Sequence, residues 1–108
     1  MIAVDTSALM AIILDEPQAA DCIAVLASEQ EVLISAATVA EAMIVAAMRN
    51  LGTEMETLIS ELGFEILPVT GPVAMRVAQA YGKWGKGLHP AGLNFGDCFA
   101  YDVAKQNN

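Results

Sequence analysis

The chain has 108 residues, of which 56% are hydrophobic and 6% aromatic, so we expect one globular domain with a real core and exclude a disordered chain. Thirteen acidic residues against five basic ones leave a formal charge of −8, which disfavours nucleic-acid binding through a broad basic patch. Asp5 interrupts the start of any signal peptide and Glu41 lies within the most apolar stretch, so neither a signal peptide nor a membrane span is expected and a cytoplasmic protein is predicted.

The predicted elements alternate between strands and helices. In chain order they are a strand at 2–5, helices at 7–14 and 17–28, a strand at 32–35, helices at 37–50 and 53–62, a strand at 65–69, a helix at 72–84, a glycine-rich loop, and a last helix ending near 105. Thr53 with Glu56 three residues later is typical of a capping box. The helix at 37–50 is apolar almost all round, so its own fold, a partner or both must bury it. The alternation predicts an α/β fold with a parallel sheet.

Asp5 is expected at the carboxyl end of the first strand, where open α/β sheets place their ligand sites. The residue fits the N-cap of the next helix, and it equally fits a metal ligand beside the hydroxyls of Thr6 and Ser7. A phosphotransferase with an aspartate nucleophile would begin in the same way. Its second aspartate is expected two residues later, where this chain has Ser7, so that enzyme class is disfavoured.

Glu41 is a carboxylate on an otherwise apolar helix. An isolated buried carboxylate is costly, so it must protonate or find a cation. The alternatives are a narrow solvent-facing strip or an ion pair with Arg49 or Arg76. A functional role is favoured over these alternatives.

Asp97 is the third acid in apolar surroundings. It also fits the third position of a helix capped by Asn94, where an acid favours the helix dipole. Asp102, five residues later, is rotated away from Asp97 and is expected to face solvent. Three carboxylates brought together repel each other unless a cation joins them, so Asp5, Glu41 and Asp97 are predicted to form a divalent-metal site.

The stretch from Tyr81 to Pro90 contains Lys83, Lys86, the only tryptophan, Trp84, and the only histidine, His89. We expect either a mobile loop whose basic residues touch a phosphate backbone while the indole stacks on a base, or a solvated connector with the indole on the core. His89 has no neighbouring cysteine or nucleophile pattern, so neither a zinc site nor a catalytic triad is supported.

Together these segments resemble the PIN-domain family, and specifically VapC-type toxins of bacterial type II toxin–antitoxin systems. The matching pieces are Val4–Leu9, Thr38–Glu41, and the most specific stretch, Tyr81 with Gly85–Tyr101. The resemblance covers essentially the whole chain in one order. It implies a PIN-like α/β/α sandwich with a central parallel sheet.

The resemblance further implies an endoribonuclease that depends on Mg²⁺ or Mn²⁺ and is neutralised by a cognate antitoxin. Asp5, Glu41 and Asp97 match the metal-binding acids of the family, and Thr6 or Ser7 matches a hydroxyl that helps to order metal-bound water or phosphate. Family members are typically homodimers, which agrees with the apolar helix. RNA contacts are expected from Ser7 and from the basic loop residues Lys83, Lys86 and His89.

One departure concerns the end of the chain. Family members usually continue into a further strand and a turn that carries a fourth acid, so residues 1–108 are expected to form a single domain shortened at its C-terminus, with an exposed edge at the first strand. The alternative function is a catalytically inactive PIN-like module that dimerises or binds an antitoxin. An acidic helical interaction protein, with the three acids far apart, is a third possibility.

Overall fold

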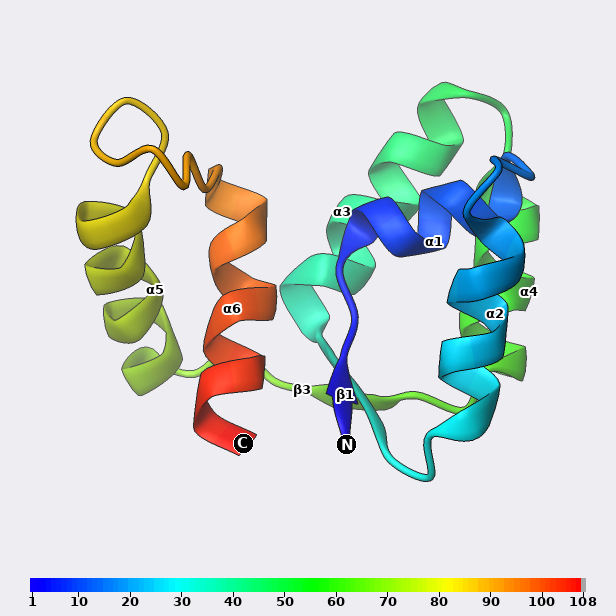
Figure 1. The fold of residues 1–108 in the computed structure, drawn as a ribbon, viewed down its shortest axis with the longest axis horizontal. Helices are drawn as coiled ribbons and strands as arrows, with labels where there is room; N and C mark the ends of the chain where they lie inside the picture. Colours follow the sequence, from blue (N-terminus) through cyan, green and yellow to red (C-terminus); the bar gives the residue numbers. More distant parts are fainter. Residues whose placement is uncertain (108) are drawn as a thin grey trace.

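The computed structural model describes residues 1–107 and has an α/β fold built on a parallel sheet (Figure 1). Its strands are β1 (Ile2–Ala3), β2 (Val32–Ser35) and β3 (Glu65–Leu67), in the spatial order β1-β2-β3, with Ile34 opposite Ile66. The central strand β2 is buried along its whole length, as expected for a strand without polar alternation. The predicted parallel α/β fold is confirmed.

Helices cover both faces of this sheet. Within residues 1–107 they are α1 (Thr6–Ile13), α2 (Ala19–Ser28), α3 (Ala36–Met48), α4 (Gly52–Glu61), α5 (Gly71–Trp84) and α6 (Phe95–Asn107). Figure 1 shows α5 and α6 on one side of the strands and α1, α2 and α4 on the other, which is the predicted α/β/α arrangement. No helix within these residues has the length and apolar character needed to cross a membrane.

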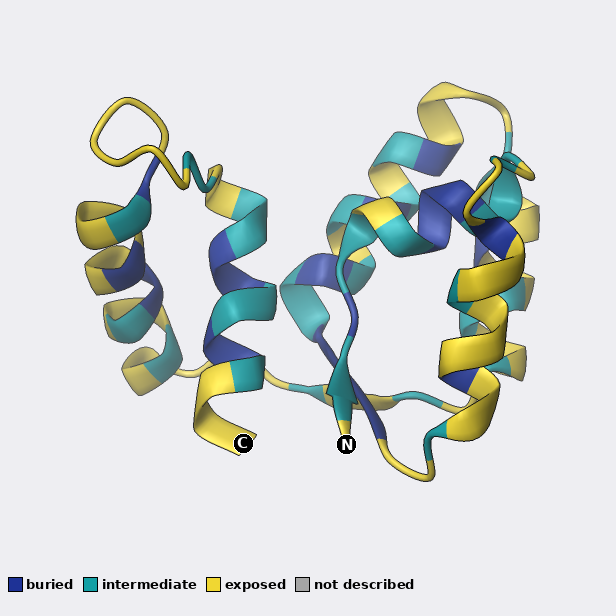
Figure 2. Ribbon diagram, in the orientation of Figure 1, coloured by how far each residue is buried: buried dark blue, intermediate teal, exposed yellow. Residues whose placement is uncertain are grey.

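The buried residues form two hydrophobic clusters (Figure 2). The larger cluster lies among the sheet and α1–α4, with Leu9, Ile34 and Met55 fully buried. The smaller one lies between α5 and α6 around Cys98 and Phe99. Helix α6 contacts β1, β2 and α3 in addition to α5, so packing on both of its sides fixes its position. The first turn of α6 is thereby held beside the carboxyl ends of the strands.

The predicted capping box at Thr53 is wrong. Helix α4 already begins at Gly52, and its N-cap is Leu51, which makes no side-chain capping hydrogen bond. Asn50 adopts a left-handed backbone with φ of 60°, and this tight turn leads directly into the helix. Within it, the Leu51 N–H donates to the Ala46 carbonyl at 2.8 Å. The turn at Asn50 and Leu51 starts α4, so Thr53 lies inside the helix.

The prediction that Asp102 faces solvent is also wrong. Asp102 is only 5% exposed, and its carboxylate accepts two hydrogen bonds from Arg76, at 2.7 Å from Nε and 3.2 Å from Nη2. These bonds raise the pKa of the Arg76 guanidinium. The pairing arises because α5 packs along α6, which places two residues far apart in sequence side by side. Arg76 is therefore paired with Asp102 and not, as one alternative had it, with Glu41.

Candidate active site

Asp5 lies where β1 passes into α1. Its extended backbone, with φ of −109° and ψ of 172°, makes it the N-cap of α1. One oxygen, Oδ1, accepts the Ala8 N–H at 3.1 Å and the Ser7 hydroxyl at 2.9 Å. The capping role predicted as one alternative is thus confirmed. It occupies Oδ1, and no hydrogen bond to Oδ2 is found within residues 1–107.

Glu41 lies on the second turn of α3, which starts immediately after β2. Ser35 caps this helix by accepting the Ala37 N–H at 3.2 Å, so α3 leaves the sheet at the same end as α1. The Glu41 carboxylate accepts a short hydrogen bond from the Thr6 hydroxyl. It also lies against Gly96, because a methyl group added there would approach the Glu41 Cδ to 2.8 Å. Glu41 therefore faces the first turns of α1 and α6.

Asp97 lies in the first turn of α6 and forms a reciprocal cap with Asn94. Asp97 Oδ2 accepts the Asn94 N–H at 2.9 Å, and the Asn94 side-chain oxygen accepts the Asp97 N–H at 2.8 Å. The predicted helix start is confirmed. Burial, and then the negative charge of Asp97, raise the pKa of the neighbouring Cys98 thiol. One carboxylate oxygen of Asp97 thus accepts a backbone hydrogen bond at the start of α6, as one oxygen of Asp5 does at the start of α1.

A continuous path of contacts links the three predicted metal-binding acids. Asp5 adjoins Thr6, which donates to Glu41, and Glu41 lies against Gly96, which adjoins Asp97. Neither ion pair found in residues 1–107 involves these acids. Over the same residues, no three carboxylate, imidazole or thiol groups are close enough together to hold a metal ion. Glu41 thus lies against the chain neighbours of Asp5 and Asp97, while the carboxylates of those two acids are held in separate helix caps.

The chemistry of these side chains fits a hard divalent cation. Carboxylate and hydroxyl oxygens are the ligands that Mg²⁺ and Mn²⁺ prefer. The capping bonds of Asp5 and Asp97 each occupy one oxygen and leave the other without a partner among the described residues. All three acids are partly exposed to solvent.

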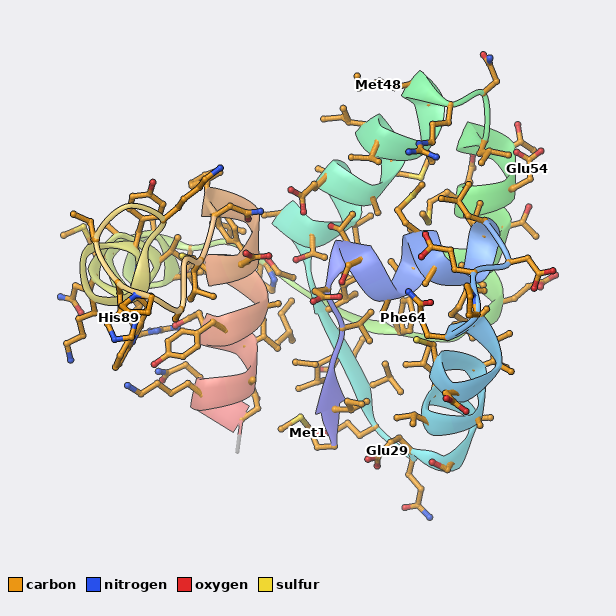
Figure 3. All side chains as sticks on the ribbon, turned by 45° about the horizontal axis from the view of Figure 1, so that its top comes forward. Met1, Glu29, Met48, Glu54, Phe64 and His89 are labelled. Carbon is orange, nitrogen blue, oxygen red and sulfur yellow. The ribbon has the colours of Figure 1, made fainter. Side chains whose placement is uncertain are left out.

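The predicted RNA-contacting residues fall into two groups. Ser7 is exposed beside the acids and donates to Asp5. Lys83, Lys86 and His89 are exposed at the end of α5 and in the following loop, and Figure 3 shows His89 beyond α6 as seen from α1 and α3. The imidazole packs edge-on against Trp84, with ring centroids 4.7 Å apart. The basic loop residues therefore do not lie beside the three acids.

Two residues of this region were missed by the sequence interpretation. Gly96 allows the close approach of Glu41, and a glycine in the first turn of a helix, where it is disfavoured, was a usable signal. Thr38 is 2% exposed, and its hydroxyl has no hydrogen-bond partner among the described residues. Thr38 lies in the matching segment Thr38–Glu41, but no sequence pattern predicts that its hydroxyl is buried without a partner within residues 1–107.

Comparison with known proteins assigns the family. The PIN-domain family model matches residues 2–108. The VapC ribonuclease Mb2004c of Mycobacterium bovis is 41% identical over 106 residues, covering 94% of this chain and 76% of that protein. Ribonuclease VapC28 of Mycobacterium tuberculosis is 41% identical over 105 residues, with 94% and 79% covered, and Ribonuclease VapC of Mycolicibacterium smegmatis is 37% identical, with 94% and 81% covered. The chain therefore belongs to the PIN-domain family, as its motifs predicted.

Proposed function

We propose that this protein is an endoribonuclease toxin of a type II toxin–antitoxin system that cleaves RNA phosphodiester bonds with the help of Mg²⁺ or Mn²⁺. The proposal is supported by the contacts of Glu41 with Thr6 and Gly96, the residues that adjoin Asp5 and Asp97 in the chain. Membership of the PIN-domain family and similarity to proteins named VapC ribonuclease support it. The proposed substrate class is RNA, which is a soluble polymer of the cytoplasm.

In this proposal the three acids hold the cation, which when bound lowers the pKa of a water molecule and offsets charge on the phosphate. The Thr6 hydroxyl donates a hydrogen bond to Glu41 and so fixes the orientation of that carboxylate. Ser7 does the same for Asp5. The repulsion among the three negative charges favours cation binding, because the described residues provide them with no basic partner.

Two partners belong to the proposal. A cognate antitoxin with a basic segment suits a chain of charge −8, particularly beside three carboxylates that form no ion pair within residues 1–107. A second copy suits α3, where Ile44 is 62% and Met48 is 81% exposed although the helix is apolar almost all round. We propose a homodimer that buries this exposed side of α3.

Replacing Asp5 with asparagine tests the site. Asparagine caps helices as well as aspartate does, so D5N keeps α1 intact while removing the charge needed for the cation. We expect the far-ultraviolet circular dichroism and the urea midpoint to stay near wild type and metal-dependent RNA cleavage to be lost. The matched control is D15N, which removes the same charge from an exposed position beyond the other end of α1, at a positive φ that asparagine tolerates. Equal cleavage by D5N and D15N would reject the site.

The alternative is a catalytically inactive module that binds an antitoxin or dimerises. The separate anchoring of the three acids, with no ready three-ligand cluster in residues 1–107, is the observation in its favour. Calorimetric titration with Mn²⁺ distinguishes the two functions. Saturable binding that D5N abolishes supports the nuclease, whereas equal weak binding by wild type, D5N and D15N supports the module.

A further inference from the structure

A pocket of about 300 Å³ lies between α5 and α6, on a part of α6 that does not face Glu41. Arg76 and Lys83 line it from α5, and Lys105 lines it from α6. The chain has only five basic residues, so three of them converge on this one pocket. Trp84 and Tyr101 contribute aromatic rings to the same walls.

The charge of the pocket is opposite to that of the whole molecule. Asp102 is its only acidic lining residue, and that carboxylate is already bonded to Arg76. The three cations and one anion leave a local charge of +2 in a chain of charge −8. Lys83 and Lys105 are both exposed. The pocket is thus a small site for an anion on an acidic protein.

The aromatic rings limit the kind of anion that fits. The Lys105 ammonium lies 5.8 Å from the centroid of the Tyr101 ring, so cation and ring share one wall. Trp84 packs edge-on against His89 and is only half buried. Flat rings interleaved with lysines are the combination by which proteins bind single-stranded nucleic acid, with bases stacked on the rings and phosphates near the cations. An acidic peptide would use the cations but has no need of the rings.

The pocket also lies along a direct path from the carboxylates. Tyr101 and Lys105 follow Asp97 by one and two turns of α6, about 6 Å and about 12 Å along the helix axis. A strand held at Asp97 therefore reaches the pocket by following one side of a single helix.

We propose that this pocket binds a nucleotide of single-stranded RNA flanking the bond held at the carboxylates, with its phosphate between Lys83 and Lys105 and its base against the aromatic rings. The inference rests on the proposed nuclease function and extends it to a second contact region on α5 and α6. Arg76 and its partner Asp102 form the floor that fixes the two helices relative to each other.

The test measures RNA binding without cleavage. The full chain is titrated with a short single-stranded RNA in the presence of a chelator, and binding is followed by the fluorescence of Trp84, the only tryptophan. K83Q and K105Q are compared with R49Q, which removes the same charge at the exposed C-cap of α3. We expect RNA to quench Trp84, each lysine variant to bind about three- to tenfold more weakly, and its salt slope to fall by about 0.7, with R49Q near wild type on both measures.

Three outcomes would overturn the proposal. RNA binding that leaves Trp84 fluorescence unchanged places the strand elsewhere. Equal weakening by K83Q, K105Q and R49Q shows that only net charge matters. Quenching by poly-glutamate but not by RNA assigns the pocket to an acidic peptide. Cleavage assays separate this proposal from the proposed nuclease function. If the wild type cleaves RNA and the lysine variants bind RNA as the wild type does, only the pocket is refuted. If RNA quenches Trp84 and D5N still cleaves RNA, only the carboxylate site is refuted.

Discussion

Replacing Gly96 with alanine tests whether the Glu41 carboxylate lies against the first turn of α6. In a helix with ordinary φ this substitution normally stabilises by up to about 0.5–1 kcal/mol. At Gly96 the added methyl carbon would lie 2.7 Å from Glu41 Oε1 and 2.8 Å from its Cδ, which is too close for either to stay in place. The flexible end of Glu41 must therefore swing away and lose the hydrogen bond from Thr6.

The expected magnitude follows from these two opposing effects. A hydrogen bond to a charged group contributes about 1.5–3 kcal/mol, and the lower end applies because Glu41 and Thr6 are both partly exposed to water. Subtracting the helix gain leaves G96A less stable than wild type by about 1 kcal/mol. Gly82, in the last turn of α5, is the matched control, because apart from its own helix backbone and chain neighbours no described atom lies within 4 Å of the added methyl carbon. G82A should be more stable than wild type by up to about 1 kcal/mol.

Urea unfolding followed by circular dichroism measures both variants, provided that the transitions are two-state. The same substitution is then repeated in an E41A background, where the obstructing carboxylate is absent. There we expect G96A to stabilise the protein as G82A does, so the cycle yields a coupling energy of about 1.5–2 kcal/mol between positions 41 and 96. If G96A stabilises the wild-type chain as much as G82A does, Glu41 is not beside Gly96, and the link between the acids is lost.

Three further predictions concern the surroundings of the site. D102N should lower the urea midpoint far more than replacement of an exposed acid, since it removes one of the two oxygens that accept from Arg76 together with the negative charge that balances the guanidinium. T38V should raise the free energy of unfolding by about 1 kcal/mol, because it removes a buried hydroxyl that has no partner among the described residues and keeps the side-chain shape. A thiol reagent at neutral pH should modify the half-buried Cys22 first and Cys98 only on unfolding. Cys98 is fully buried, and its raised thiol pKa keeps it in the less reactive protonated form. Equal modification rates for the two cysteines would contradict this.

The order of the elements and the parallel sheet could be predicted because they follow from local signals. Short apolar runs predicted the strands, of which β2 is buried along its whole length, and Asn94 predicted the start of α6. Asp5 was placed at a strand end for the same reason, and its cap was one of the two stated alternatives. These features depend on neighbours in the chain and not on the packing of distant segments.

The contacts between distant segments could not be predicted. The periodicity of α3 shows that Glu41 projects from an apolar helix, but not that α1 and α6 lie in front of it. The pairing of Asp102 with Arg76 depends on how α5 is aligned along α6, which no residue pattern specifies. Both missed features are side-chain contacts across helices, where rotation by one residue changes the partner.

Asp5 and Asp97 each have a structural role beside the proposed chemical one, and the structural role compensates for the lack of a basic partner among residues 1–107. Each carboxylate accepts backbone N–H groups at the start of a helix, where the helix dipole stabilises negative charge. The electrostatic cost of gathering the acids is thus offset by α1 and α6 before any cation binds. Asparagine retains most of the capping interaction but not the charge, so D5N and D97N should fold while losing cation affinity. Alanine at either position would instead remove the cap as well, and its effects on cation binding and on stability could not be separated.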